Sequence, residues 1–320
     1  MKNRIKHAIY YDNRFGRNDG SPLYYFNVMK NQLKLDVVHL IPIGDTQKQF
    51  GNFDFHWWVD WGEDALSQMG LVNLSWKIPK DGGKTIYVAS DTHIDNGYRL
   101  NKAKEFDYVF LNQKRALEDF LKILQKDKLR QADELPPYES IWLPHAAEPK
   151  AYPKFEILKK WDICFIGHVQ ETPNEFFHNL TRVDVLDRAF KEFPNFYYGS
   201  RDGGHLGINM FEDASKKFSQ SKIVLNYSIK DDVNMRVFEA MSSGSMLLTN
   251  WLPTLEDLFE DGKHLVTYKT LDEMVEKAKY YIEHDKEREK IAAAGHREFM
   301  AKHTYRKRIE KILEVIKGQK

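Results

Sequence analysis

Short apolar runs alternate along this chain with longer segments in which apolar residues recur at helical spacing. In the first half, the short runs predict strands and the amphipathic segments between them predict helices. The predicted strands cover residues 7–11, 36–40, 55–59, 85–89, 108–111 and 141–143, and the predicted helices cover 22–33, 98–104 and 114–126. This alternation is typical of βαβ units around a parallel sheet.

The same alternation starts again in the second half. The predicted strands cover residues 163–166, 196–198, 223–225, 246–249 and 264–267, and the predicted helices cover 175–193, 210–219, 235–243, 271–284 and 286–316. Between the halves, Pro144, Pro149 and Pro153 block helix formation and suit a linker. The pattern predicts an α/β fold with two Rossmann-like, doubly wound domains.

A length of 320 residues exceeds what one core usually supports, which agrees with two domains. We expect residues 1–150 to form an N-terminal domain and residues 151–300 to form a C-terminal domain, with the two facing a cleft. Ligands in doubly wound sheets bind beyond the carboxyl ends of the strands, so the loops after strands are the places to look for function.

Composition narrows the classes of partner and compartment. Lys plus Arg number 48 and Asp plus Glu number 47. The chain therefore lacks the overall positive charge on which sequence-independent binding of nucleic acid depends. The single cysteine, Cys164, lies in an apolar run and is expected to be a buried, inert thiol. We find neither a signal-peptide pattern nor a run of about 18 apolar residues, which favours a cytoplasmic protein without a transmembrane segment.

The segment 231–249 combines a polar loop, a helix start, a glycine stop and a buried strand. A helix that begins near Asn234 directs unpaired N–H groups and a positive dipole end outwards, which suits a diphosphate. Arg236 in the first turn can bind a phosphate oxygen, and Glu239 on the same face can accept both hydrogen bonds of a ribose diol. Val237 lies between them. A surface Arg–Glu pair is the simpler alternative, but it explains neither the polar loop nor the small-residue exit.

The stretch NMRVFEAMSSGSMLLT, preceded by SKIVLNYS, resembles the donor-binding signature of CgeB-like, spore-protein-type glycosyltransferases of the GT-B class, which are similar to the glycosyl transferases of group 1. The resemblance includes DICFIGHV as the first strand and loop of the second half and extends weakly into the first half. It implies a hexosyltransferase-like enzyme with a nucleotide-sugar donor, and a terminal helix at 301–320 that packs back toward the N-terminal domain.

The resemblance also implies roles for two acidic residues. Retaining GT-B relatives carry two acidic residues separated by seven others, the first at the sugar and the second at the ribose. Asp231 and Glu239 have this spacing, with Asp in place of the usual first Glu. We therefore expect Asp231 and Arg236 among the catalytic residues and a retaining reaction.

Further donor-side candidates lie after strands of the second half. Gly167 lets backbone approach the donor, and His168 can touch a phosphate or be a solvated turn residue. Arg182 resembles the basic residue that meets the diphosphate in this family, with a plain surface arginine as the alternative. Asn226 and Tyr227 end a predicted strand, and Tyr227 faces the nucleotide or lies in the core.

The first half supplies acceptor-side candidates in two polar loops. Asn13, Arg14 and Gly16 lie in a loop that lacks the G-x-G-x-x-G fingerprint, so a dinucleotide-dependent dehydrogenase is poorly supported. Such a loop lies under the transferred sugar in GT-B relatives. Asp91 and His93 can reach a sugar hydroxyl or a nucleophile's proton, and they are the first-half catalytic candidates. Ordinary turn chemistry is the alternative for both loops.

An aromatic cluster gives one more acceptor-side pair. Most of the rings at 53–61 are expected in the core, whereas Trp61, next to Asp60 at the strand end, is placed to stack on an acceptor.

The sequence contains no Asp-x-Asp, the pattern by which many sugar transferases hold a divalent metal. We therefore predict a metal-independent transfer with no cofactor and with a UDP-sugar as the first choice of co-substrate. An inverting reaction would instead need a base such as Asp91 or His93. The acceptor stays open among protein, glycan, small molecule and modified DNA, and the oligomeric state stays open too. The rival functions are a non-catalytic nucleotide-sugar-binding or spore-surface structural protein of the same fold, and a sugar-phosphate epimerase.

Overall fold

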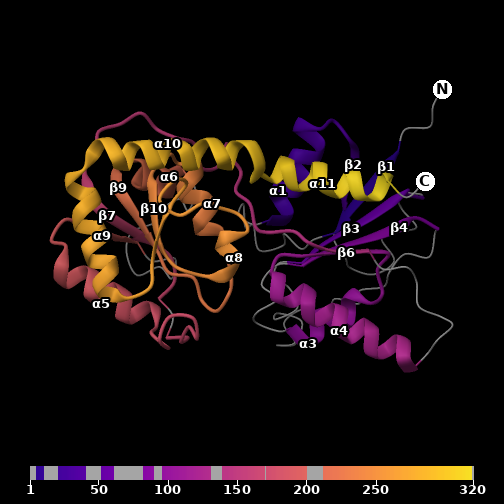
Figure 1. The fold of residues 1–320 in the computed structure, drawn as a ribbon. Helices are drawn as coiled ribbons and strands as arrows, with labels where there is room; N and C mark the ends of the chain where they lie inside the picture. Colours follow the sequence, from indigo (N-terminus) through magenta and orange to yellow (C-terminus); the bar gives the residue numbers. More distant parts are fainter. Residues whose placement is uncertain are drawn as a thin grey trace. The chain divides into compact units, whose positions relative to one another are not determined.

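A computed structural model describes residues 5–10, 21–40, 52–60, 82–89, 96–130, 139–169, 171–199 and 212–318 of the chain. The chain divides into two compact units (Figure 1). Unit 1 comprises Met1–Pro144 and Arg308–Lys320, and unit 2 comprises His145–Lys307. The last helix of the chain thus belongs mainly to the unit that contains the first strand.

Unit 1 is built on a six-stranded sheet with the order β2-β1-β3-β4-β5-β6. Every pairing in it is parallel, as the alternating pattern predicts. Its strands are β1 (Lys6–Tyr10), β2 (Asp36–Leu40), β3 (Phe55–Asp60), β4 (Lys84–Ala89), β5 (Tyr108–Leu111) and β6 (Glu139–Trp142). The central strands are buried on both faces, which explains their continuous apolar runs.

Helices cover both faces of this sheet (Figure 1). One face carries α1 (Ser21–Asn27), the π-helix η1 (Val28–Gln32) and α11 (Tyr305–Lys317), and the other carries α3 (Asn96–Ala103) and α4 (Lys114–Arg130). The predicted helix 22–33 therefore exists, but its second half has the wider winding, in which the Leu33 N–H donates to the Val28 carbonyl at 2.9 Å.

Unit 2 is built on a five-stranded parallel sheet with the order β11-β10-β9-β7-β8. Its strands are β7 (Trp161–Ile166), β8 (Phe196–Gly199), β9 (Ser221–Asn226), β10 (Met246–Asn250) and β11 (Val266–Tyr268). The sheet has an amino edge, where the strands begin, and a carboxyl edge, where they end. Crossovers bring all the loops that follow strands to the carboxyl edge.

Two apolar clusters fix the helices of unit 2 on its sheet. One contains residues of α6 (Glu212–Ser219) and α7 (Met235–Ser242), and the other contains residues of α5 (Arg182–Glu192) and α9 (Leu271–Glu283). The helix α10 (Asp285–Lys302) contributes Phe299 to the first cluster and Ile291 to the second. The short helix α8 (Pro253–Glu256) follows β10. Cys164 is fully buried in the first cluster, and burial raises the pKa of its thiol to about 12, as expected for an inert cysteine.

The helix predicted at 175–193 begins later than expected, at Arg182. Thr181 and Asp184 form a capping box that starts α5, so the preceding residues cannot continue it. His178 and Asn179 have φ values of 50° and 57°, a left-handed conformation that is incompatible with a helix.

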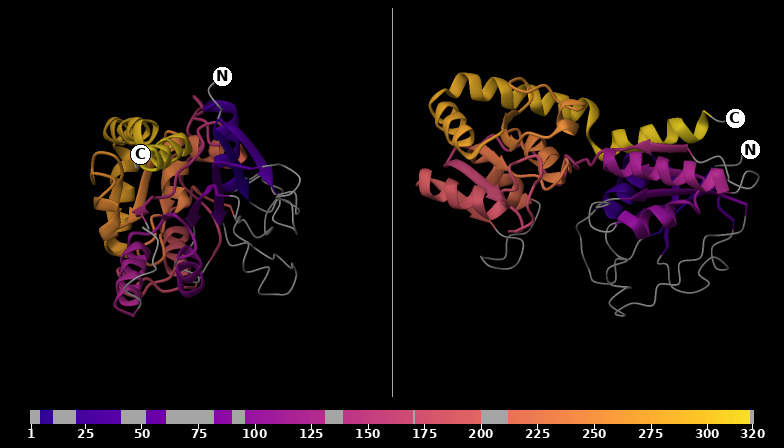
Figure 2. Two further views of the ribbon diagram at one scale, coloured as in Figure 1. Left: turned by 90° about the vertical axis from the view of Figure 1, so that its right-hand side faces the viewer. Right: turned by 60° about the horizontal axis from the view of Figure 1, so that its bottom comes forward.

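The single helix predicted at 286–316 is two helices, α10 and α11, as Figure 2 shows. The break lies at His303 and Thr304. Thr304 forms an isolated parallel bridge with Ala147, and the Tyr305 N–H donates to the Ala147 carbonyl at 3.3 Å. Pairing with a distant segment interrupts the helix, and a local pattern cannot reveal such a pairing.

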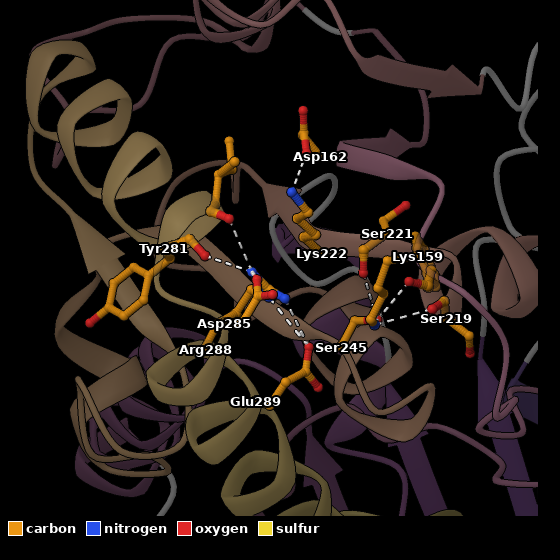
Figure 3. Close-up of polar contacts among 12 residues, drawn as sticks. Lys159, Asp162, Ser219, Ser221, Lys222, Ser245, Tyr281, Asp285, Arg288 and Glu289 are labelled. Atoms are coloured by element: carbon orange, nitrogen blue, oxygen red, sulfur yellow. Dashed lines mark hydrogen bonds and ion pairs between the residues drawn. The ribbon is translucent and has the colours of Figure 1, made fainter.

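The amino edge of unit 2 is closed by internal polar contacts (Figure 3). The ammonium of Lys159 lies 3.1 Å from the Ser219 carbonyl oxygen and 3.4 Å from the Ser245 hydroxyl, and burial lowers its pKa. Lys222 forms an ion pair with Asp162 at 2.8 Å. These contacts hold together the starts of β7, β9 and β10.

Beside that edge, the guanidinium of Arg288 is 3% exposed and binds Asp285 at 2.6 Å and Glu289 at 3.2 Å (Figure 3). It also donates to the Tyr281 carbonyl at 2.8 Å. The charge of this buried cation is thus compensated within unit 2.

None of the helices in the described ranges has the length and apolar character of a membrane span.

Candidate functional site

The start of α7 lies at the carboxyl edge of unit 2, after the loop that follows β9. Asn234 is the N-cap residue, with φ −67° and ψ 167°, but its side chain makes no cap hydrogen bond. Its amide nitrogen turns away and donates to the Ser228 hydroxyl at 3.1 Å and to the Asn226 side-chain oxygen at 3.3 Å. A residue type that commonly caps helices therefore does not cover the first N–H groups of this one.

Arg236, in the first turn of α7, is held in a fixed orientation. Its Nε donates to the Ile166 carbonyl at the end of β7, and its Nη1 donates to the Asn226 Oδ1 at 3.0 Å. The guanidinium carbon lies 4.4 Å from the centre of the Phe165 ring, a cation–π contact. These contacts fix the guanidinium before any ligand binds, so the arginine is a preorganised cation.

Gly167 makes the position of this guanidinium possible. A Cβ atom built on Gly167 would lie 1.6 Å from Nη2 of Arg236, so any other residue would displace the arginine. The predicted role of this glycine was close approach of the donor to the backbone. The structure shows close approach of Arg236, which is a more specific reason for glycine here.

A buried network of amides and hydroxyls supports the same edge. Asn226 donates to the hydroxyls of Ser228 at 3.2 Å and Thr249 at 3.0 Å. Asn250 accepts from the Ser228 N–H at 2.7 Å, and Asn174 donates to the Ser228 carbonyl at 2.7 Å. All five of these side chains are completely buried. Mutually satisfied polar groups of this kind stiffen a site.

Glu239 follows Arg236 by three residues on α7 and is 4% exposed. Its backbone carbonyl accepts from the N–H and the hydroxyl of Ser243, at 3.1 and 2.9 Å. The residues around it on the helix, including Val237, are buried, so α7 is anchored along its length. Val237 contributes packing to this site and shows no exposed side chain.

Arg182 also lies near the ring of Phe165. Its Nη1 donates to the His168 carbonyl at 2.6 Å and its Nη2 to the Tyr227 carbonyl at 2.9 Å, and its guanidinium carbon lies 5.6 Å from the centre of the Phe165 ring. The side chain is buried, so the plain surface arginine is not what the structure shows. Arg182 joins the loops after β7 and β9, and His168 beside it is half-buried.

Tyr227 takes the core position that the sequence left open. Its ring is fully buried against Phe177, and its hydroxyl donates to the Leu180 carbonyl. Burial raises the pKa of this hydroxyl well above its ordinary value. Its side chain therefore faces the interior, and only its backbone carbonyl, bound to Arg182, takes part in the edge.

Asp231 is engaged by the start of α8. Its carboxylate accepts from the Thr254 hydroxyl at 2.6 Å and from the Thr254 N–H at 3.3 Å, the arrangement of a helix cap supplied from another segment. Its neighbour Asp232 is buried, with Oδ1 3.9 Å from the Nε2 of buried His145. The two acids thus fix the loop before α7 from two sides.

Of the first-half candidates, only Asp60 falls within the described residues. It ends β3, is 2% exposed and accepts from the Tyr87 hydroxyl at 2.6 Å. The other predicted positions lie outside the described residues: Asn13, Arg14, Gly16, Trp61, Asp91 and His93. In the described part of the chain, no group of three His, Cys, Asp or Glu side chains could hold a metal ion.

Sequence reasoning missed Phe165, Asn174, Ser228, Thr249 and Asn250. Phe165, Ser228, Thr249 and Asn250 lie in or next to strands, where an apolar or small polar residue looks like ordinary core, and Asn174 lies in the loop between β7 and α5. Asn250 and Thr249 do carry a signal, because two polar residues at the end of a buried strand need partners when they are buried.

Comparison with known proteins relates the chain to one family model and to several solved structures. Residues 182–314 match the family model described as glycosyl transferase-like. The fold is similar to HepE of Anabaena in complex with UDP-glucose, with a TM-score of 0.61, 12% identity, and coverage of 98% of this chain and 100% of that one. Sucrose-phosphate synthase from Thermosynechococcus elongatus gives a TM-score of 0.61 at 9% identity, with 98% and 99% coverage.

The glycosyltransferase from Rickettsia africae gives a TM-score of 0.56 at 9% identity, with 99% and 98% coverage. The chain has the GT-B fold. At these identities the likeness concerns the fold, which spans both units and nearly the whole chain. A comparison with curated protein sequences found no match.

Proposed function

We propose that this protein is a glycosyltransferase that moves a sugar from a nucleoside diphosphate sugar to an acceptor, with a UDP-sugar as the first choice of donor. The observation that carries the proposal is the start of α7, where an N-cap side chain leaves the N–H groups uncovered beside an oriented arginine. A GT-B neighbour that was crystallised with UDP-glucose supports the choice of donor.

In the proposed complex, the diphosphate lies against the start of α7. Negative charge grows on the diphosphate as the glycosidic bond breaks, so a cation fixed in advance stabilises the transition state more than the bound donor. Arg236 and the helix terminus supply the compensating positive charge, and Arg182, near the same Phe165 ring, adds to the positive potential. We therefore propose that transfer does not depend on a divalent metal.

Glu239 is assigned to the ribose. A carboxylate accepts both hydroxyl hydrogens of a diol, and a buried α7 keeps that carboxylate at a fixed distance from Arg236. The separation of Asp231 and Glu239 by seven residues supports a retaining reaction and a CgeB-like relationship. Because Thr254 binds Asp231, we assign Asp231 first to the shape of the loop that receives the sugar.

A screen for slow donor hydrolysis tests this proposal without knowledge of the acceptor. Purified protein is incubated with UDP-, GDP-, dTDP- and ADP-sugars, and the release of nucleoside diphosphate is followed. We expect release from one class of donor, with UDP-sugars first, and unchanged rates in excess EDTA. NMR of the released sugar reports whether the anomeric configuration is retained.

The outcomes separate the proposed functions. Activity that disappears in EDTA and returns with Mg²⁺ or Mn²⁺ would contradict metal independence. Tight binding of a nucleoside diphosphate together with no hydrolysis or transfer of any donor would favour the non-catalytic nucleotide-sugar-binding protein. Absence of both binding and release would contradict the donor site itself.

A further inference from the structure

Trp251 occupies a place at the carboxyl edge of unit 2 that the donor site described above does not use. It directly follows β10, and its backbone N–H donates to the Tyr268 carbonyl of β11 at 2.9 Å. Two residues earlier, Thr249 binds Asn226, which in turn binds Arg236. Adjacent strands lie roughly 5 Å apart, so Trp251 is one strand away from the residues that orient Arg236.

Two charged side chains hold the indole in place. Its Nε1 donates to the Glu256 carboxylate of α8 at 2.8 Å, and the ammonium of Lys269, after β11, lies 4.9 Å from the ring centre. Both partners are exposed, and the ring is half-buried. A large rigid aromatic side chain that is fixed before binding loses little conformational entropy when a ligand arrives.

The chemistry of such a ring suits a sugar. One face of a hexose presents several C–H groups, and an aromatic face carries negative charge density that attracts them. Lys269 lies over one face of the ring, so a sugar would stack on the other face, with Glu256 at the edge of the ring as an acceptor for its hydroxyls. Thr254 of α8 binds Asp231 in the loop before α7, and Glu256 of α8 binds the indole, so the ring and this loop lie at the same part of the edge.

We propose that Trp251 is a stacking surface for a sugar ring in the active site, with Glu256 as the residue that positions its indole. This inference rests on the proposed function and adds to it a subsite for the sugar rather than for the nucleotide. The sugar ring can belong to the donor or to the acceptor, and the experiment distinguishes the two sources.

Trp161 provides a matched control. It begins β7 at the amino edge of the same sheet, and the ammonium of Lys160 lies 5.0 Å from the centre of its ring. Its surroundings also include a ring contact with Tyr197 at 5.3 Å. The two tryptophans thus share the same cation–π chemistry and differ in the edge on which they lie.

The test compares Trp251→Ala, Trp251→Phe and Trp161→Ala in the full chain, after thermal unfolding has shown that each variant is folded. Calorimetry measures the affinity for UDP and for UDP-glucose. We expect Trp251→Ala to leave the UDP affinity within about twofold and to weaken UDP-glucose binding roughly tenfold, with a smaller loss in Trp251→Phe. Trp161→Ala should change neither affinity. This pattern assigns the ring to the donor sugar.

Saturation-transfer NMR tests the acceptor source, with methyl glucoside added to the UDP-bound protein. If Trp251→Ala loses the saturation-transfer signal of methyl glucoside while its donor affinity is unchanged, the ring binds an acceptor sugar. Unchanged results in both measurements, or equal losses in Trp161→Ala, would overturn the inference. Wild-type protein that binds neither UDP nor UDP-glucose would contradict the proposed function itself, and this subsite with it.

Discussion

The described contacts of cationic side chains differ between the two edges of the sheet in unit 2. At the amino edge, Lys222 binds Asp162, and nearby Arg288 binds Asp285 and Glu289. At the carboxyl edge, the hydrogen bonds described for Arg182 and Arg236 go to backbone carbonyls and to an asparagine amide. At the amino edge these contacts join elements of the fold, whereas at the carboxyl edge they hold two guanidinium groups in fixed orientations near the start of α7. The proposed donor site is consistent with this contrast.

The helix starts of unit 2 show a parallel difference. α5 begins with a capping box between Thr181 and Asp184, and α9 begins with Thr270 bonded to the Glu273 N–H. At α7, the Asn234 side chain makes no cap bond. Side chains that cap a helix occupy the N–H groups that a phosphate would need. Among these three helices, α7 is the one that is suited to bind a phosphate; α10 also lacks a side-chain cap, but it begins directly after α9, beside the amino edge.

The comparison predicts its largest effect at Arg236. Arg236→Ala should lower the rate of donor hydrolysis by ~10²–10³, because one preorganised donor of charge stabilisation is lost. The variant should remain folded with a somewhat lower melting temperature, because the bonds to Ile166 and Asn226 are lost, so the rates are compared well below that temperature. Lys222→Ala is the control at the amino edge and should leave the rate unchanged. Equal rates in Arg236→Ala and wild type would remove the arginine from the mechanism.

Glu239→Ala should weaken nucleotide binding by roughly 1–3 kcal/mol, the value of paired hydrogen bonds to a charged group. Calorimetry with UDP and with uracil plus phosphate separates the ribose contribution from the rest. Glu239→Gln keeps one acceptor, so its UDP affinity should lie between those of the wild type and Glu239→Ala. A folded Glu239→Ala protein that binds UDP with wild-type affinity would show that the ribose lies elsewhere.

Arg288→Ala tests whether a cation beside the amino edge contributes to stability and not to binding. The loss of its contacts to Asp285, Glu289 and the Tyr281 carbonyl should lower the free energy of unfolding by roughly 1–2 kcal/mol. UDP affinity, measured below the melting temperature, should not change. A loss of affinity without a loss of stability would erase the distinction between the two edges.

Gly167→Ala tests the fit of the arginine directly. The added Cβ would lie 1.6 Å from Nη2 of Arg236, so the guanidinium must move. We expect about tenfold weaker UDP binding, or about 1.4 kcal/mol, together with a loss of stability, because the φ of 158° at Gly167 also strains a side chain. Gly262→Ala is the control, because no atom lies within 4 Å of its added Cβ while its φ of 73° strains a side chain. That variant should lose stability and keep its affinity.

The smallest expected effect concerns pH and Lys159. Burial lowers the pKa of Lys159 in the folded protein below its ordinary value of 10.5. As pH rises toward 10.5, the folded state releases this proton before the unfolded state does, so the unfolded state binds more protons and stability rises. Wild-type protein should therefore gain stability relative to Lys159→Met over that range in urea unfolding. A difference that is independent of pH would contradict the shift.

The sequence predicted the strands well, because a parallel sheet buried on both faces needs continuous apolar runs such as 163–166. It also placed Arg236 and Glu239 on one helix at the carboxyl edge, since helix starts and charged residues are local signals. It did not predict the break at Thr304, which depends on Ala147, or the bond between Asp231 and Thr254. Contacts between distant segments leave no periodic pattern, and the buried network around Asn226 belongs to the same category.

Hydrogen–deuterium exchange with and without UDP reports directly where the nucleotide binds. We expect protection in peptides that cover residues 226–240, with peptides that cover 217–222 at the amino edge unchanged. Arg236→Ala should reduce the protection at the same UDP concentration. Protection confined to the amino edge or to unit 1, or no protection at UDP concentrations that saturate binding, would contradict a donor site at the carboxyl edge of unit 2.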